Sequence, residues 1–405
     1  MKKQPSPLRV PYALTVYGKE EINAVVKVLQ DPTKIVPGNQ TRLFESKIAE
    51  LFGKKYGIMV NSGSSANLLA IKALNLPEGS EVITPILTFS TTVAPLIQER
   101  LIPVFADVEI GTYTININHI KKLISKKTKA LMIPSLIGNI PNLAKIKALA
   151  RRHRLYVVED SCDTLGARYQ GKPTGVYSDI STTSFYASHI ITAAGGGGMV
   201  CVNNETLAKR IMVMRGWGRN SSLFNESESL KKRFSAKIGS MVYDSKFIFS
   251  EIGFNFQTIE LCAAFGLVQL ERLTKFAATR KWAFKKLHGF FLQYEKYFVL
   301  PQELPGVETS WLAFPLTIKT NAPFTRLELT TYLEEHNIQT RPIFTGNILK
   351  QPGFKKIQCR TLPGGYPAAD QIMQNSFLIG CHHGMEVKHV QYLTRVFQEF
   401  IDQHV

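Results

Sequence analysis

Polar and aromatic residues stand directly after four apolar, strand-like runs of this 405-residue sequence. Ligands of open α/β sheets gather where strands end in loops, so side chains at these positions could do chemistry. The four segments are NSGSSAN (61–67), TPILTFS (84–90), VEDSCD (158–163) and SFYASH (184–189). Their residue types indicate an anion site, an aromatic platform, an acid cluster and a titratable imidazole.

The segment 61–67 follows an expected strand and opens an expected helix. Its small residues let backbone N–H groups and the helix dipole meet a phosphate, and Ser64 and Ser65 add hydroxyls. An ordinary capped Gly-Ser loop would have the same composition, so this segment alone leaves both interpretations open. Phe89, beyond the next strand, is either a core residue or a ring that stacks on a planar cofactor.

Three carboxylates, Glu159, Asp160 and Asp163, occupy five positions at the end of another apolar run. Acids at the mouth of a sheet need a partner cation or a proton. They indicate a ligand site, unless they form a solvated turn or a helix cap.

His189 precedes the turn Gly195–Gly198. Four glycines permit positive φ or a close backbone approach, which an ordinary strand entry does not need. A single histidine is more often structural than catalytic, so the interpretation of His189 depends on its neighbours.

The elements that must position these residues follow from an alternation of helix-like stretches with short apolar runs between about 20 and 215. This alternation is typical of a mostly parallel sheet with crossover helices. A polar excursion is expected from Trp217 to Phe249, and helices near 259–273 and 276–294. The expected strands are Tyr56–Val60, Glu81–Thr84, Ile102–Phe105, Ala130–Pro134, Leu155–Val158 and Met199–Val202.

Length and composition indicate the domain organisation. A chain of 405 residues exceeds what one core usually organises, and 44% hydrophobic with 20% charged residues suits a globular protein. We therefore expect an α/β protein with a large domain at 1–275 and a smaller C-terminal α/β domain at 276–405.

The formal charge of +18 is compatible with nucleic acid, an anionic membrane or a phosphorylated small molecule as partner. The basic residues occur in short groups without a long arm or zinc-finger pattern, so nucleic acid is not expected. No run of about 18 apolar residues occurs, so no membrane partner is expected. Five scattered cysteines indicate neither a disulfide framework nor a CxxC metal site, and favour a cytoplasmic location.

Taken together, the motifs carry a family resemblance. The order NSGSSANLLAI, TPILTFS, VVEDSCDTLGA, SFYASH, GGMV, MRGWGRN and GFNFQTIELCAAFGLVQLERL resembles the DegT/DnrJ/EryC1/StrS family over about residues 15 to 400. The resemblance implies pyridoxal-phosphate (PLP) chemistry on nucleotide-linked sugars. It also implies the fold type I architecture of aspartate aminotransferase, with a large α/β/α domain, a smaller C-terminal domain, and active sites shared across a homodimer.

The resemblance assigns expected roles to matching residues. Asp160 would meet the pyridine nitrogen of the cofactor, where a carboxylate strengthens the ring as an electron sink, and Phe89 would stack on the ring. Asp163 stands where the aminotransferases usually carry Gln or His near the ring hydroxyl. The residues expected around the phosphate are Ser64, Ser65, Ser184 and, from the neighbouring subunit, Asn255. The charge of the chain, rather than the resemblance, makes Arg219 and Arg341 candidates for the entrance used by a diphosphate-linked sugar, and a solvated face is the alternative for each.

The decisive departure from the family pattern is His189. Aminotransferases of the family have lysine there, because a primary amine must form the Schiff base with the cofactor aldehyde. No lysine lies between Lys172 and Lys209, so a shift of register cannot supply one. Histidine at this place resembles the nucleotide-sugar 3-dehydratases, which use pyridoxamine phosphate. The resemblance makes His189 the base that takes a proton and then helps the C3 hydroxyl to leave.

Two groups of such dehydratases differ in how they renew the cofactor. One carries a [2Fe–2S] cluster, whose cysteine-rich stretch would match Asn220–Ser229; that stretch has no cysteine, so no iron–sulfur cluster is expected. The other transaminates with glutamate, which we expect as amino donor. Gly195 replaces a Glu of many relatives. An aminotransferase, or an idle sugar- or nucleic-acid-binding relative, remains as an alternative.

Overall fold

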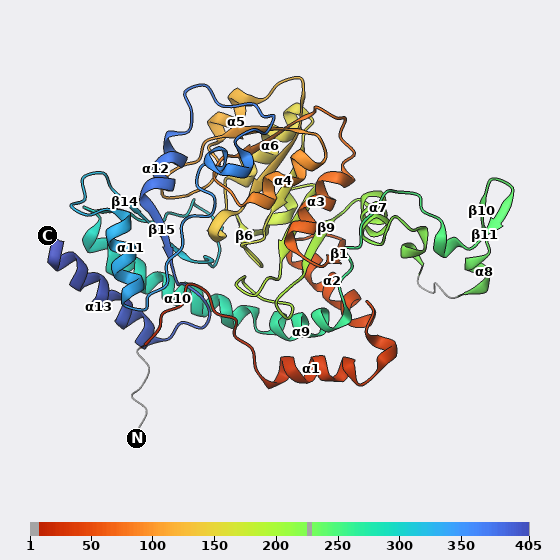
Figure 1. Cartoon of the computed structure of the whole chain (residues 1–405), viewed down its shortest axis with the longest axis horizontal. Coiled ribbons are helices and arrows are strands. Elements are labelled where there is room, and N and C mark those ends of the chain that lie inside the picture. Colours follow the sequence, from red (N-terminus) through yellow and green to blue (C-terminus); the bar gives the residue numbers. More distant parts are fainter. Residues whose placement is uncertain (1–7, 225–228, 405) are drawn as a thin grey trace.

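A computed structural model describes residues 8–224 and 229–404 (Figure 1). Its centre is a seven-stranded sheet in the order β1-β9-β8-β5-β4-β2-β3. Six of these strands run in one direction and β9 runs against them. The mostly parallel sheet expected from the sequence is therefore confirmed. The strands are β1 (Tyr56–Val60), β2 (Glu81–Pro85), β3 (Ile102–Ala106), β4 (Thr128–Pro134), β5 (Tyr156–Asp160), β8 (Ile180–Ser184) and β9 (Gly198–Val202).

Helices cover both faces of this sheet, because its strands are apolar on both sides. Alternate strand residues enter different cores: Val200 packs beneath α3 and α7, and its neighbour Met199 beneath α2 and α9. The helices of this region are α1 (Lys19–Leu29), α2 (Asn39–Leu51), α3 (Gly63–Ala73), α4 (Ser90–Gln98), α5 (Ile117–Leu123), α6 (Leu143–His153), α7 (Glu205–Arg215) and α9 (Glu260–Glu271).

Strand β5 runs two residues beyond its predicted end, so Glu159 and Asp160 belong to the buried strand. Carboxylates are tolerated there because hydroxyl and amide donors surround them. Glu159 accepts hydrogen bonds from Ser161 at 2.7 Å and Ser181 at 2.8 Å.

A second, antiparallel sheet is formed by β12 (Phe298–Val299), β14 (Phe314–Ile318) and β15 (Ser376–Ile379). Its core also contains Val10, so the N-terminal segment packs on this sheet. The predicted boundary at 275 falls within the long helix α10 and remains a prediction. The helices here are α10 (Leu273–Phe291), α11 (Arg326–Glu335), α12 (Pro367–Asn375) and α13 (Val387–His404), and a small third sheet joins β6 (Arg168–Tyr169), β7 (Lys172–Pro173) and β13 (Val307–Glu308).

The described residues of the expected excursion, 217–224 and 229–249, project from the body as an arm, at the right of Figure 1. It is more regular than the sequence indicates, since it contains α8 (Leu230–Arg233) and a hairpin of β10 (Ala236–Ile238) and β11 (Met241–Tyr243). Its two ends lie side by side, because Trp217 N donates to Phe254 O at 2.8 Å. Gly218, with φ of +86°, is so close to the returning segment that a Cβ there would lie 1.8 Å from Glu251 O.

Candidate active site

Asp160 ends β5 and is held by three donors at the carboxyl edge of the sheet. Its Oδ2 accepts from Asn67 Nδ2 at 2.9 Å and from Thr92 Oγ1 at 2.7 Å, and its Oδ1 accepts from Cys162 N at 3.2 Å. Asn67 is itself fixed, because its Oδ1 accepts from Thr182 Oγ1 at 2.6 Å. The carboxylate therefore has a defined position, held from two helices and its own strand end.

The first turn of α3 lies beside the end of β8. Ser62 caps the helix, and its Oγ accepts from Ser65 N at 3.1 Å. Ser65 is buried and Ser64 exposed. Gly63 is required here, since a Cβ would lie 2.6 Å from the Ser184 Cβ. The structure thus brings Ser64, Ser65 and Ser184 to one helix N-terminus, as an anion site needs.

His189 is half-buried in the loop after β8. Burial, as the largest cause, lowers the pKa of its imidazole to about 4, against the opposing charge of Asp160. Its Nδ1 atom is buried without a hydrogen-bond partner among the described residues. The imidazole is therefore uncharged at neutral pH and has an unused nitrogen, as a proton acceptor needs.

Asp163 is half-buried near these groups, and its Oδ2 accepts from Ile137 N at 2.9 Å. Burial and the charge of Asp160 raise its pKa to about 7. At neutral pH this carboxyl group is therefore protonated for much of the time and is then a hydrogen-bond donor.

Phe89 stands at the start of α4 with half of its surface exposed, and its ring contacts Phe344 edge to face. Thr92, which holds Asp160, lies on the same helix, so the exposed ring of Phe89 could serve as a platform for a stacked planar group.

A planar cofactor fits this site on the evidence of its unused polar atoms. Besides His189 Nδ1, buried hydroxyls without a partner in the described chain occur around the carboxyl ends of β2, β4 and β5. Buried polar groups are normally paired, so several unpaired hydroxyls at one edge of the sheet suit a polar ligand bound there. These hydroxyls belong to Thr84, Thr88, Ser135 and Thr164.

The two arginines and Asn255 make no hydrogen bond to the serines of the candidate anion site among the described residues. Arg219 stacks on Trp217 at 4.1 Å, whereas Arg341 is exposed over the Tyr12 ring at 5.8 Å. Asn255 is exposed, but its neighbour Phe256 lies beside the start of the Ser-rich segment, where its carbonyl oxygen accepts from Asn61 N at 3.0 Å.

Tyr12 links Arg341 to the acid cluster. Burial raises the pKa of Tyr12, the charge of Asp163 adds to this, and Arg280 and Arg341 oppose it. Tyr12 therefore lies within electrostatic range of both Asp163 and Arg341.

Sequence reasoning missed Asn67 and Thr92, the residues that hold Asp160. Both are polar residues buried on helices, at 1% exposure each. Asn67 within the apolar stretch of α3 is a usable signal, since a buried amide needs a partner.

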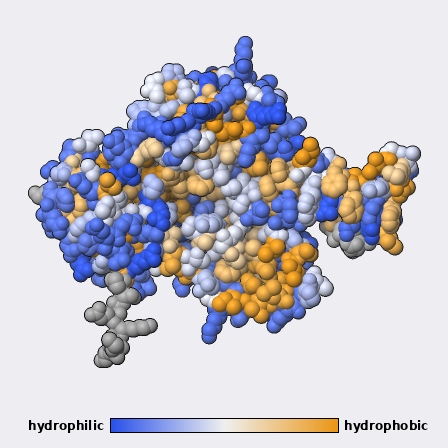
Figure 2. Space-filling model, viewed as in Figure 1, coloured by the Kyte–Doolittle hydropathy of each residue, from blue (hydrophilic) through white to orange (hydrophobic). Residues whose placement is uncertain are grey.

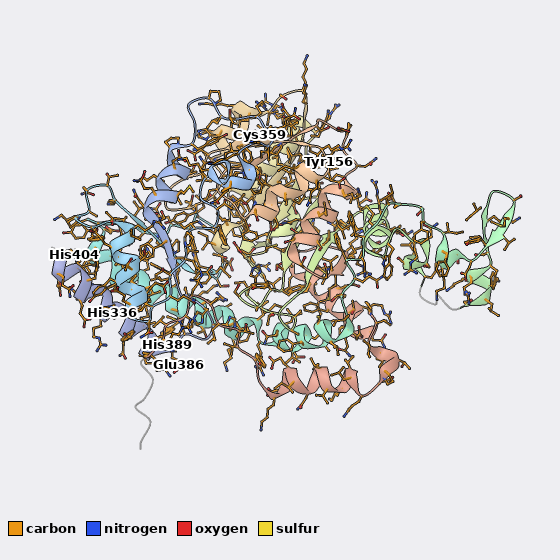
Figure 3. All side chains as sticks on the ribbon, viewed as in Figure 1. Tyr156, His336, Cys359, Glu386, His389 and His404 are labelled. Atoms are coloured by element: carbon orange, nitrogen blue, oxygen red, sulfur yellow. The ribbon has the colours of Figure 1, made fainter. Side chains whose placement is uncertain are left out.

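No group of three or more metal-binding side chains occurs in residues 8–224 and 229–404. The labelled histidines in Figure 3 illustrate this, because His336, His389 and His404 lie apart from one another. His336 and His389 make local bonds instead, to Tyr332 O at 2.7 Å and Glu386 N at 3.0 Å. In the same residues, no helix combines the length and the apolar character needed to cross a membrane.

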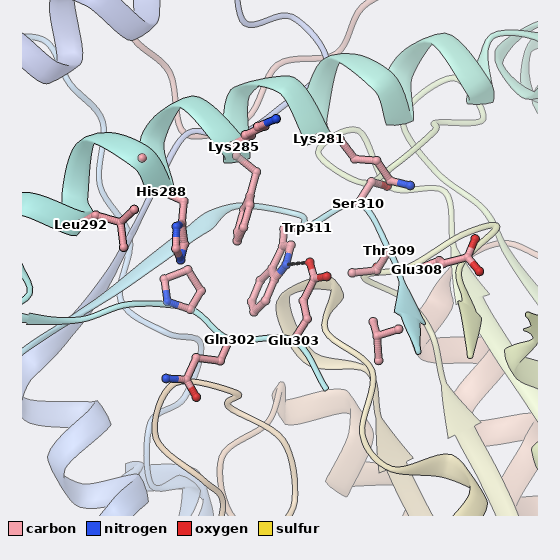
Figure 4. A pocket seen from close by; sticks show the side chains of 14 residues that line it. Lys281, Lys285, His288, Leu292, Gln302, Glu303, Glu308, Thr309, Ser310 and Trp311 are labelled. Carbon is pink, nitrogen blue, oxygen red and sulfur yellow. Dashed lines mark hydrogen bonds between the residues drawn. The ribbon is translucent and has the colours of Figure 1, made fainter. Parts of the chain in front are cut away.

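A separate cavity of about 900 Å³ lies between α10 and the segment 301–311 (Figure 4). Lys281, Lys285 and His288 line it, together with Trp311, whose Nε1 donates to Glu303 at 2.7 Å. None of the predicted site residues lines this cavity, so it is not the cofactor site described above.

Comparison with known proteins decides the family. The profile of the DegT/DnrJ/EryC1/StrS aminotransferase family matches residues 16–398. The chain belongs to this family. It is 37% identical to lipopolysaccharide biosynthesis protein RfbH of Salmonella typhimurium, over 96% of this chain and 91% of that protein. It is 33% identical to the GDP-4-keto-6-deoxy-D-mannose 3-dehydratase of Yersinia pseudotuberculosis, over 93% of this chain and 94% of the relative.

The family fold is also found among solved structures. One of GDP-4-keto-6-deoxymannose-3-dehydratase, with a trapped PLP-glutamate geminal diamine, matches with a TM-score of 0.86 and 28% identity. It covers 96% of this chain and 99% of the other. The expected fold type I architecture of the DegT/DnrJ/EryC1/StrS family is therefore confirmed.

Proposed function

We propose that this chain is a PLP-dependent 3-dehydratase that removes the C3 oxygen of a nucleotide-linked 4-keto-6-deoxyhexose. Two features of the site support this function. Asp160 is present and is held by Asn67. His189 stands where family aminotransferases have their lysine. Histidine cannot bind an aldehyde as a stable imine, but it moves protons. The relatives named as 3-dehydratases support this function.

The residues of this chain would hold the cofactor as the family does. When bound in its pyridoxamine form, the cofactor supplies an amine for the C4 ketone and the two electrons that replace the C3 hydroxyl. Asp160 would keep the pyridine nitrogen protonated. Phe89 would cover one face of the ring. Protonated Asp163 would donate to the ring oxygen, as the Gln or His of the aminotransferases does.

His189 would carry the proton transfer. Its imidazole, with a pKa of about 4 before the ligands bind, is free to accept a proton at neutral pH. It would then return that proton to the departing C3 oxygen, which leaves as water. A second step needs an amino donor, and glutamate is supported by the adduct in the solved relative.

An exposed apolar patch on the surface of the chain favours a homodimer. Large apolar side chains of α1 and α2 and of the segment between them face solvent, and they form the orange patch below the centre of Figure 2. Soluble monomers rarely expose such a continuous patch, and a second copy would cover it. Asn255 would then reach the phosphate of the neighbouring subunit. The exposed side chains are Ile22, Val26, Leu29, Ile35, Val36 and Leu43.

The proposed function is tested with purified protein, PLP, glutamate and 4-keto-6-deoxyhexoses linked to GDP, CDP or dTDP. A dehydratase gives a sugar lighter by one oxygen atom, with two hydrogens at C3 in the NMR spectrum and 2-oxoglutarate in the medium. An aminotransferase gives a C4 amine instead and keeps the C3 oxygen. An idle binding relative gives neither product, and either of the last two results contradicts the proposal.

A further inference from the structure

A buried arginine ties the loop of His189 to the second sheet region. Arg280 of α10 is 1% exposed. Its Nη1 donates to the carbonyl oxygens of Trp311 at 3.2 Å, Leu312 at 2.9 Å and Cys381 at 3.1 Å. Its Nη2 donates to the carbonyl oxygen of His189 at 3.3 Å.

The guanidinium has no carboxylate partner in the described part of the chain. Burying an unpaired charge is costly, and arginine is seldom fully buried without an acid. Here backbone carbonyls replace the acid, and Nη2 also lies 3.2 Å from His383 Nδ1. Burial lowers the Arg280 pKa to about 10, so it keeps its charge at neutral pH.

His189 depends on this contact because its loop has little regular structure. Its N–H donates to Tyr186 O at 3.0 Å, and its carbonyl oxygen is the atom that Arg280 binds. Both backbone polar groups of His189 are therefore fixed, and the direction of its side chain follows from them.

We propose that Arg280 is a positioning residue for His189: it fixes the His189 carbonyl so that the imidazole is aimed at the reacting atoms beside Asp160. This inference rests on the proposed acid–base role of His189. His383 acts with Arg280, because it accepts from Nη2 and stacks on Phe276 with ring centres 4.0 Å apart.

The positive charge has a second effect on the imidazole. The groups that face His189 are Asp160, Arg280 and the backbone of Ser184 and Cys162. Tyr186 adds an edge-to-face ring contact at 6.0 Å. Burial lowers the His189 pKa most, and Arg280 lowers it further against the opposing effect of Asp160. Removing the Arg280 charge should therefore raise that pKa.

Two substitutions separate geometry from charge. Arg280→Lys keeps a charge but cannot reach four carbonyls at once, whereas Arg280→Met removes the charge as well. We expect both to lower kcat by about 100-fold, since small misplacement of a catalytic group costs that much, with KM changed less than threefold. Only Arg280→Met should move the acid limb of the kcat profile to higher pH. His383→Phe, which keeps the stacked ring, should give a smaller loss and serves if Arg280→Met does not fold.

A readout that needs no turnover is the carbethoxylation of His189 by diethyl pyrocarbonate, followed by peptide mass spectrometry. Only the neutral imidazole reacts, so the wild-type rate should stay flat from pH 7.5 to 5.5. In Arg280→Met the rate should begin to fall at a higher pH than in the wild type, because one of the charges that lower the His189 pKa has been removed.

Arg360→Met is the matched control. Arg360 is less buried than Arg280, and it joins the C-terminal half to the sheet through Glu81 at 2.9 Å, at the other end of β2. It should lower the melting temperature without changing the pH profile or His189 reactivity. If the Arg280 variants differ from Arg360→Met in neither readout, Arg280 is only structural. If the wild type dehydrates no sugar, the proposed function fails, yet the carbethoxylation rates still decide whether Arg280 positions His189.

Discussion

The side-chain amide of Asn67 donates to the carboxylate of Asp160 at 2.9 Å, which fastens the first turns of α3 to the end of β5. One contact thus fixes the distance between the helix N-terminus that suits a phosphate and the acid that suits a pyridinium. A rigid cofactor that bridges these two groups would need this distance to be constant, and the Asn67–Asp160 hydrogen bond keeps it so.

Asp160→Asn should lower kcat by about 100-fold or more while the protein still folds, because the proposed role of the carboxylate is electronic. The asparagine oxygen can still accept from Asn67 and Thr92, so only the bond from Cys162 N is lost. Single-turnover rates and thermal melts measure the two effects. Thr92→Val, which removes one bond and keeps the charge, is the control; wild-type turnover in Asp160→Asn would separate Asp160 from the ring nitrogen.

Substitution of His189 should abolish the reaction in two distinguishable ways. His189→Asn removes the base and should lower kcat by about 10²–10⁴-fold. His189→Lys should also stop dehydration, but with PLP it should give a covalent adduct that borohydride reduces, because a primary amine now has the same reach. Mass spectrometry of the reduced protein detects that adduct. Retained 3-dehydration in His189→Lys would show that the imidazole is not the required base.

Asp163 should make the cofactor-free protein less stable at alkaline pH. Folding raises its pKa from 3.8 to about 7, so the folded protein binds more protons than the unfolded chain between these values. This contribution to stability is complete below pH 3.8 and is lost as pH rises through 7. Asp163→Asn cannot ionise and keeps an acceptor for Ile137 N. It should gain up to about 4 kcal/mol over wild type at pH 8 and nothing near pH 4, by urea unfolding. An equal gain at both pH values would contradict the raised pKa.

The catalytic cycle should run without iron. The stretch Asn220–Ser229 has no cysteine, and the five cysteines of the chain are scattered. Anaerobic reconstitution with iron and sulfide, followed by desalting, should leave far less than one cluster per chain. Glutamate alone should sustain turnover in the presence of a chelator. Stoichiometric iron and sulfide together with chelator-sensitive activity would overturn this prediction.

Complementation should reveal whether Asn255 acts in the neighbouring subunit. His189→Asn and Asn255→Ala should each be nearly inactive alone. After mixing and subunit exchange, half of the dimers are mixed and each has one intact site, so about a quarter of wild-type activity should return. Activity that stays at the level of the separate variants would place Asn255 in its own chain's site or outside the reaction. His189→Asn mixed with itself through the same protocol is the control.

The sequence predicts the positions of the individual strands better than their order and direction in the sheet. Strands such as Tyr56–Val60 were predicted within a residue or two, because apolar runs flanked by glycine and polar residues leave little choice. That β9 would insert between β1 and β8 against the common direction is not visible in such runs, since strand order depends on long-range pairing.

The candidate site was likewise predicted only in part from the sequence. Asp160 and His189 stand out by motif and position, but the partners of Asp160 are 93 and 68 residues away in the chain. Arg280 is one basic residue among 49, and only its burial distinguishes it. Long-range contacts of single side chains produce no periodic pattern in the sequence, so they cannot be predicted from hydrophobic periodicity.

The closed base of the arm has a practical consequence for engineering. Trp217 and Phe254 are joined at this base, and Ser250 N also donates to Gly218 O at 2.9 Å. The backbone that enters and leaves the arm is therefore held together without the outer residues of the arm. The arm is therefore a removable insert: a short linker from Asn220 to Phe249 would close the same gap. A chain trimmed in this way is expected to retain its fold, although the linker would also remove the bond that Ser222 Oγ donates to Gly216 O at 3.4 Å.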